Sequence, residues 1–222
     1  MPTVLNDPKL DALLARLHGA SKDQQPAIQR YFREERTGPW NGMEARDLAF
    51  MADKLEALDQ DKAELCYMLC RAIGARRIVE AGTSFGVSTL YLAAAVRDNG
   101  GGTVFAAERE PTKVKIARGN YEAAGLAGFI ELHEGDVVEA CKGFEGPIDF
   151  ILFDIWIEAV RPMLDILAPR LRPGAVICVD NTGGEWGRKN YGALFEVLED
   201  PTRGFRTMTL PFSGGFELAV KV

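Results

Sequence analysis

The chain has 222 residues, 47% of them hydrophobic and 26% charged, which is the composition of a globular protein with one sizeable core. Its 26 lysines and arginines against 32 acidic residues give a net charge of −6, which argues against nucleic acid or an anionic membrane as a partner. The sequence has no signal-peptide core near its start and no apolar run of about 20 residues, so we expect a cytoplasmic protein without a membrane span.

Residues 1–76 have the pattern of several helices. Helical segments are expected from Asp7-Pro8 onward, over 21–36, over 44–57 and over 61–73. Ser21 and Gln24 have the spacing of a capping box, so the second helix is expected to begin there. The loop 38–42, Gly-Pro-Trp-Asn-Gly, interrupts the helices and either connects them or covers a site. We therefore expect residues 1–58 to form a helical cap on a domain that spans residues 59–222.

From residue 77 the sequence alternates between strands and helices. Strands are expected over 77–81, 103–107, 128–132, 148–153 and 175–180, with helices over 86–98, 111–124, 137–142 and 158–170 between them. The runs IDFILF and AVICV are continuously apolar, as in strands buried on both faces of a parallel sheet. After a helix at about 189–199, two strands over 205–210 and 216–222 are joined by Pro-Phe-Ser-Gly-Gly, which indicates a hairpin. The sequence therefore predicts a doubly wound α/β fold with a seven-stranded, mostly parallel sheet and an antiparallel last strand.

The segment RIVEAGTSFGVS, residues 77–88, reads as a strand that ends in an acid, a glycine turn and the start of a helix. Gly82 can adopt positive φ and let a ligand approach the backbone, while the helix presents free N–H groups and its positive dipole end. Such a turn binds an anionic or nucleotide-like ligand, although it also occurs as a plain connection. The acid in front of the turn, Glu80, repels phosphate and suits an ammonium group, which favours a zwitterionic nucleoside without phosphate.

Every expected parallel strand leads to an acidic residue at its carboxyl end: Glu80, Glu108, Asp136, Asp154 and Asp180-Asn181. The carboxyl ends of parallel strands form one rim, where doubly wound folds bind their ligands. Glu108 lies about 20 residues past the turn and is placed to accept both hydroxyls of a ribose, unless it is a solvated strand-end acid. Asp136 either accepts from an adenine amino group or caps the helix after it.

The last three of these side chains have the chemistry of a metal site. Asp154, Asp180 and Asn181 offer two carboxylates and an amide oxygen, which are the hard oxygen ligands that Mg²⁺ prefers. The alternative is that Asp180 and Asn181 only turn the chain and Asp154 is structural. The four cysteines, Cys66, Cys70, Cys141 and Cys178, complete no zinc set and are expected to be buried free thiols.

The stretch from about residue 59 to residue 222 resembles the class I S-adenosylmethionine-dependent methyltransferases, above all the catechol and caffeoyl-CoA O-methyltransferase group. The segment EAGTSFGVS is similar to the first motif of that group, AAERE to its ribose-binding strand end and EGD to its adenine-side turn. FDIW followed by VDNTGG is similar to its metal motifs. The terminal hairpin matches the reversed last strand of that fold.

The resemblance implies S-adenosylmethionine as cofactor, Mg²⁺ or another divalent cation, a small aromatic diol as acceptor and a homodimer. For the cofactor, the family's roles fall on Glu80, Gly82, Ser88, Glu108 and Asp136. For the metal, they fall on Asp154, Asp180 and Asn181, with Asp154 also expected to take part in catalysis. Trp156 either walls the acceptor pocket or packs in the core.

One position departs from the family pattern. The lysine that usually follows the strand-four aspartate by three residues, as general base, is Ile157 here. Our leading hypothesis is still a metal-dependent O-methyltransferase, because a divalent ion lowers the pKa of a bound hydroxyl. Three alternatives stay open: a metal-independent methyltransferase on another small acceptor, an NAD-dependent oxidoreductase and a non-catalytic nucleoside-binding module.

Overall fold

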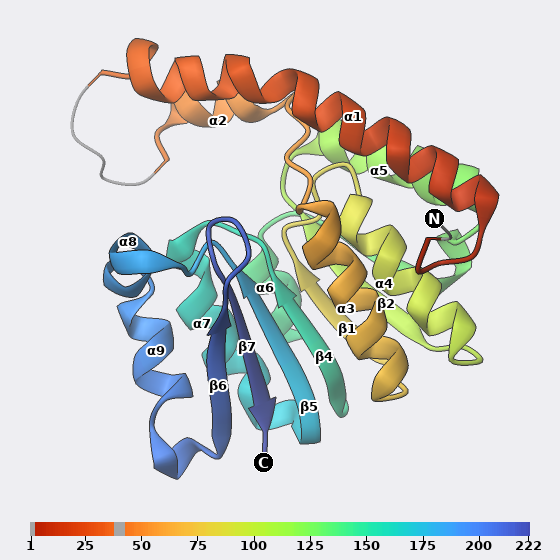
Figure 1. Cartoon of the computed structure of the whole chain (residues 1–222), viewed down its shortest axis with the longest axis vertical. Helices are drawn as coiled ribbons and strands as arrows, with labels where there is room; N and C mark the ends of the chain where they lie inside the picture. The colour runs from red at the N-terminus through yellow and green to blue at the C-terminus, as the bar shows by residue number, and fades with distance from the viewer. Residues whose placement is uncertain (1–2, 38–42) are drawn as a thin grey trace.

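In the computed structural model, which describes residues 3–37 and 43–222, a seven-stranded sheet forms the centre of the protein (Figure 1). The strands are β1 (Arg77–Ala81), β2 (Thr103–Glu108), β3 (Ile130–Glu134), β4 (Ile148–Phe153), β5 (Leu171–Asp180), β6 (Phe205–Leu210) and β7 (Phe216–Lys221). They lie in the order β3-β2-β1-β4-β5-β7-β6. The pairs among β1 to β5 are parallel, whereas β7 runs antiparallel to β5 and β6. The predicted doubly wound fold with a reversed last strand is confirmed.

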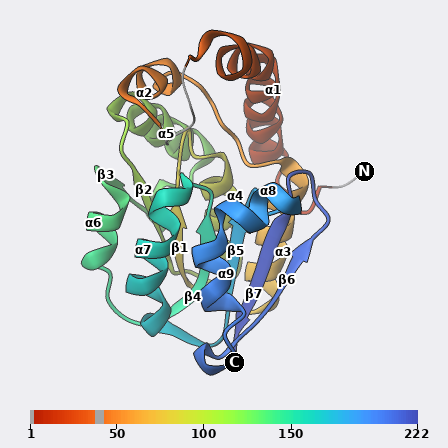
Figure 2. The same cartoon turned by 90° about the vertical axis from the view of Figure 1, so that its left-hand side faces the viewer.

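Helices cover both faces of this sheet (Figures 1 and 2). One layer contains α3 (Gln60–Ala72), α4 (Val87–Asp98) and α5 (Pro111–Ala124), and the other contains α6 (Val137–Lys142), α7 (Ile157–Leu167) and α9 (Gly192–Leu198). Successive strand residues point to opposite faces, so Ile78 packs into the core below α3 to α5 and Val79 into the other core. This explains why both faces need apolar residues and why the central strands read as continuous apolar runs.

The N-terminal region differs from the prediction of two successive helices. A single helix, α1 (Pro8–Arg30), continues through Ser21 and ends in a π-helical turn, Tyr31–Glu35. Ser21 does not cap a helix because its hydroxyl makes tertiary contacts, donating to the Leu55 carbonyl (3.1 Å) and accepting from the Ala57 N–H (3.3 Å). The side chain of Gln24 is used in the same way, since it accepts from the Leu55 N–H at 2.8 Å.

The second N-terminal helix, α2 (Ala45–Met51), is shorter than the expected segment 44–57. Glu44 and Asp47 form its capping box, and the ring of Phe50 stacks on Tyr31 at 3.9 Å, which holds α2 beside the C-terminal end of α1 (Figure 1). The predicted loop 38–42 lies outside the described residues. The predicted boundary between residues 58 and 59 stays a prediction, although leucines of α1 share a core with the sheet.

At the C-terminal end, the single helix expected at 189–199 is two helices, α8 (Gly184–Asn190) and α9, which meet at Tyr191. Strand β5 begins four residues earlier than expected, and β3 begins two residues later.

The four cysteines are free and buried, as expected. No helix within the described part of the chain is long and apolar enough to cross a bilayer.

Candidate active site

The glycine turn between β1 and α4 is packed against the end of β4. Gly82 has φ +92° and Gly86 has φ +84°, a left-handed region that favours glycine. A Cβ on Gly82 would lie 1.9 Å from the carbonyl oxygen of Asp154, and one on Gly86 would lie 2.3 Å from the ring of Tyr121. Since the Asp154 N–H also donates to the Ala81 carbonyl at 3.0 Å, glycine at residue 82 brings the turn into direct contact with the Asp154 backbone.

Glu80 lies inside this turn, completely buried. Its Oε2 accepts hydrogen bonds from the hydroxyls of Thr83 and Thr89, but its Oε1 has no partner among the described residues. Burial raises the pKa of Glu80 to about 7, even though the neighbouring hydroxyls of Thr89, Ser88 and Thr83 lower it. A buried carboxylate oxygen without a donor is costly and calls for a cationic partner such as an ammonium group.

Glu108 is held at the end of β2 by two backbone groups. The Ser84 N–H donates to its Oε2 at 2.9 Å, and the Glu110 N–H donates to its Oε1 at 2.8 Å. Because a carboxylate has about four lone-pair sites, these contacts orient Glu108 and leave acceptor capacity for a diol. Asp136 uses its Oδ1 as the N-cap of α6, accepting from the Glu139 N–H at 3.0 Å, so the capping alternative is realised.

The acids that follow β4 and β5 lie side by side, because these strands are paired with Phe153 opposite Val179. In residues 3–37 and 43–222 no side chain forms a hydrogen bond or ion pair with the carboxylate of Asp154. Burial, followed by the negative charges of Asp180, Glu56 and Glu80, raises the pKa of Asp154 well above its usual range. Without a cation beside it, this group of acids therefore favours the protonated form of Asp154.

Asp180, in contrast, has an ion-pair partner. The ammonium of Lys62 lies 2.7 Å from its Oδ1, and the side-chain amide of Asn181 donates to its Oδ2 at 3.1 Å. Sequence reasoning missed Lys62, although it occupies the same buried stripe of α3 as Cys66 and Cys70. Burial lowers the pKa of Lys62, but hydrogen bonds and charges from Asp180 and Asp59 outweigh burial and raise it, so Lys62 remains a cation.

The donor set fits a divalent ion in chemistry and charge. Asp154 offers a carboxylate without a partner, and Asp180 and Asn181 lie next to it with further oxygen atoms. The described residues contain no cluster of three or more acidic, histidine or cysteine side chains with the arrangement of a metal site. As the side chains stand, Asn181 points its amide nitrogen at Asp180, and Lys62 already occupies one oxygen of Asp180.

Other expected or overlooked side chains surround these acids. Ile157 begins α7 and packs against the apolar core, and Arg161 pairs with Asp165 at 2.9 Å. Trp156 is half-buried as the residue before α7. Tyr191, which sequence reasoning missed, is buried at the α8–α9 junction, and burial together with the charges of Asp154 and Asp180 raises its pKa.

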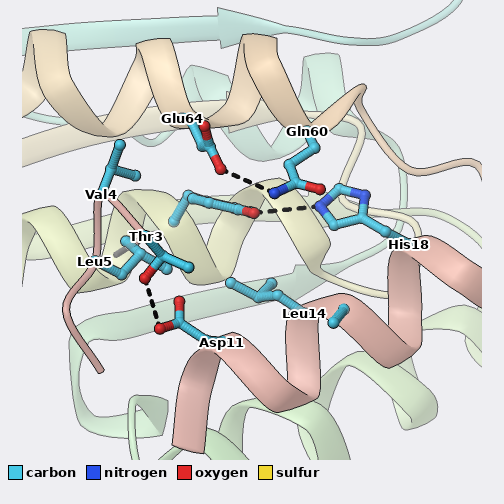
Figure 3. A pocket seen from close by; sticks show the side chains of 10 residues that line it. Thr3, Val4, Leu5, Asp11, Leu14, His18, Gln60 and Glu64 are labelled. Atoms are coloured by element: carbon cyan, nitrogen blue, oxygen red, sulfur yellow. Dashed lines mark hydrogen bonds between the residues drawn. The ribbon is translucent and has the colours of Figure 1, made fainter. Parts of the chain in front are cut away.

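Two cavities occur elsewhere. One of about 90 Å³ lies between α1 and α3, where the imidazole of His18 approaches the hydroxyl of Tyr91 at 3.3 Å (Figure 3). The other, about 450 Å³, is an open groove at the amino ends of β1 and β2, beside Arg76 and Arg77. Neither is lined by the acids at the carboxyl ends of the strands.

Comparisons with known proteins indicate a methyltransferase. A family model described as a methyltransferase domain matches residues 79–182. Catechol O-methyltransferase of Mycobacterium tuberculosis is 32% identical over 126 residues, which are 56% of this chain and 56% of that protein. Tricin synthase 1 of Oryza sativa subsp. japonica is 28% identical over 169 residues, 70% of this chain and 66% of that protein. The chain thus spans little more than half the length of the mycobacterial relative it matches.

Among solved structures, the O-methyltransferase TomG from Streptomyces achromogenes, in complex with SAM, superposes with a TM-score of 0.67 at 23% identity, covering 88% of this chain and 96% of that one. At this identity the match supports the fold. The expected resemblance is confirmed: residues 79–182 match the methyltransferase domain model, the chain has a Rossmann-like methyltransferase fold, and it is similar to the O-methyltransferases of the catechol and caffeoyl-CoA type.

Proposed function

We propose that this protein transfers a methyl group from S-adenosylmethionine to a hydroxyl oxygen of a small acceptor. The observation that carries the proposal is the buried Oε1 of Glu80, which lacks a donor within the described residues. The amino group of the methionine part of the cofactor would supply that donor and the missing positive charge. The names of the catechol O-methyltransferase relatives support the same reaction class.

In this proposal, the carboxyl ends of β1 to β3 hold the cofactor. Glu80, Gly82 and Ser88 would face its methionine end, where the turn brings backbone N–H groups close to the ligand. Glu108, oriented by two backbone N–H groups, would accept the ribose hydroxyls. Asp136 would lie near the adenine with its second oxygen, because the first caps α6.

When bound, the cofactor supplies a methyl group on a positively charged sulfur. The acceptor oxygen would attack the methyl carbon, the C–O bond forming as the C–S bond breaks, with the electron pair staying on sulfur and the hydroxyl proton passing to solvent water. The chain's contribution is position and electrostatics. As carboxylates, Glu80, Asp154 and Asp180 would stabilise a cationic sulfonium beside them, and the packing of Gly82 against the Asp154 backbone would keep the cofactor end close to the acceptor end.

We further propose a catechol-like diol as acceptor, with Asp154, Asp180 and Asn181 as the residues that would hold a divalent ion. Such an ion supplies Lewis acidity, which lowers the pKa of an adjacent hydroxyl. The metal-independent version has one observation in its favour, the ammonium of Lys62 on Asp180. A homodimer, a cytoplasmic location and the absence of nucleic-acid or membrane partners stay predictions.

The test combines binding and turnover. Calorimetry should detect S-adenosylhomocysteine, with binding about tenfold weaker in Glu80→Gln than in a control variant at the exposed Glu139, Glu139→Gln. Methyl transfer to a panel of catechols is then measured with and without EDTA. Preferential binding of NADH would contradict the proposal, and full activity in EDTA would contradict its metal-dependent version.

A further inference from the structure

Lys62 reaches from α3 into the acceptor end of the proposed site. Its side chain is 2% exposed, and its ammonium lies 2.7 Å from Oδ1 of Asp180 and 3.1 Å from Oδ2 of Asp59. Among the described residues, no other basic side chain forms an ion pair with Asp154 or Asp180. Within residues 3–37 and 43–222, Lys62 is thus the only basic side chain paired with these two acids, and the function proposed above assigns it no role.

A lysine is rarely buried to this extent, because removing an ammonium from water is costly unless a carboxylate compensates. The residues that follow Lys62 on this buried side of α3 include Ala63, Cys66 and Cys70. An apolar residue at position 62 would therefore continue the stripe. The cation is instead directed at Asp180, whose two oxygens are occupied by Lys62 and by the amide of Asn181.

We propose that Lys62 is a built-in cation that sets how tightly the rim binds a divalent ion, making such an ion an exchangeable ligand instead of a resident one. The inference deepens the function proposed above and rests on it. An ion bridging Asp154 and Asp180 would lie within a few ångströms of the Lys62 ammonium, so the two cations repel each other. It would also have to share an aspartate that already accepts two hydrogen bonds.

The two acids are therefore unequal partners for an ion. Asp154 has no neutralising partner among the described residues, whereas Asp180 is paired. A divalent ion would be held mainly by Asp154, because at Asp180 it would displace or repel Lys62. Lys62 keeps the charge at Asp180 compensated when no ion is bound.

Binding of Mn²⁺, followed by electron paramagnetic resonance of the free ion, tests this without measuring activity. The wild-type protein is expected to bind Mn²⁺ with a Kd of about 0.1 mM or weaker. Lys62→Gln removes the charge and can still donate to Asp180, so we expect binding at least about tenfold tighter. Lys62→Arg keeps the charge and is the matched control, with binding within about twofold of wild type.

The outcomes separate this inference from the function proposed above. Equal Mn²⁺ affinity of the wild type and Lys62→Gln overturns it, and so does the absence of Mn²⁺ binding in both. If the glutamine variant does not fold, a wild-type Kd in the low micromolar range still overturns it. Calorimetry with S-adenosylhomocysteine is run on every variant: a wild type that fails to bind this nucleoside refutes the proposed methyl transfer, whatever Mn²⁺ does.

Discussion

At the scale of single residues, Glu80 is a buried acid that the folded protein keeps protonated over a wider pH range than the unfolded chain does. Its pKa is about 7 in the fold, against an ordinary value of 4.5. The folded state therefore binds more protons than the unfolded state between these two values, and stability falls as pH rises from 4.5 to 7. Above pH 7 the loss is complete and no longer changes with pH.

Glu80→Gln should remove this loss. We expect the variant, without cofactor, to be more stable than the wild type at pH 8, by up to about 3 kcal/mol, and to show little difference at pH 4.5. Urea unfolding at both pH values measures the difference. Glu139→Gln on the exposed side of α6 is the control and should follow the wild type. A Glu80→Gln variant with the same pH profile as the wild type would contradict the account.

Gly82 is the second residue whose environment gives a sharp expectation. Gly82→Ala places a methyl group 1.9 Å from the Asp154 carbonyl and strains a backbone with φ +92°. We expect a loss of more than about 2 kcal/mol of unfolding free energy, together with loss of S-adenosylhomocysteine binding. Gly128→Ala, where nothing lies within 4 Å of the added Cβ, serves as control. Thermal unfolding that changes equally in both variants would refute the close-contact argument.

At the scale of elements, α1 connects the N-terminal region to the site. Its Ser21 and Gln24 hold the backbone of residue 55, and the next residue, Glu56, donates its N–H to the hydroxyl of Ser84 in the glycine turn at 3.3 Å. One chain of hydrogen bonds thus runs from α1 to the turn.

His18 makes the attachment of α1 sensitive to acid. Burial, with the positive charge of Lys22, lowers the pKa of His18, whereas the charges of Glu64 and Asp59 raise it less. Because the fold disfavours protonation of His18, the free energy of unfolding decreases as pH falls below 6.5, the pKa of histidine in the unfolded chain. His18→Gln should therefore reduce the loss of stability between pH 7.5 and pH 5.5, as measured by urea unfolding.

The control for this prediction is the other histidine of the chain. His133 lies on the edge strand β3, is partly exposed and contacts Glu131 at 2.8 Å. His133→Gln should leave the pH dependence of α1 unchanged. If both variants lose the same stability on acidification as the wild type, the pH dependence arises elsewhere.

The elements that sequence patterns identified best are those whose burial is uniform. Strand β4 and helix α5 occur with the predicted boundaries because IDFILF is buried on both faces and Pro111 and Gly125 delimit the helix. The capping pattern at Ser21 was misleading, since its hydroxyl serves a contact 34 residues away. The sequence analysis also missed the break between α8 and α9 at Tyr191. This side chain is buried at the junction of the two helices, and local helix propensity does not encode such a contact.

At the scale of the whole molecule, the alternation of side chains along each strand brings the acids at the strand ends together. Glu80, Glu108 and Asp180 continue the strand positions that face α3, α4 and α5, so they converge on one face as well as one edge of the sheet. Their convergence could be predicted from strand order alone. The pairing of Lys62 with Asp180 could not be predicted in this way. It depends on the distance between α3 and β5, and the two residues are 118 positions apart in the sequence.

The buried cysteines report on the stability of the whole fold. Cys66 and Cys178 lie in the core below α3 and α4, whereas Cys141 lies in the opposite core on the short helix α6. Burial raises the pKa of the Cys66 thiol well above its usual range, so this group reacts only when an opening of the protein exposes it to water. Its rate of alkylation therefore measures the population of open molecules.

A ligand that binds only the folded state lowers that population by mass action. At a concentration of S-adenosylhomocysteine about 100 times its Kd, the stabilisation is about 2.7 kcal/mol, so alkylation of Cys66 and Cys178 should slow by about 100-fold. Mass spectrometry of labelled peptides resolves each thiol. Cys141 should slow equally if its exposure needs global unfolding, and less if α6 opens alone. Alkylation of Cys66 at the same rate with and without the nucleoside would mean that the rim and the α3 core do not unfold as one unit.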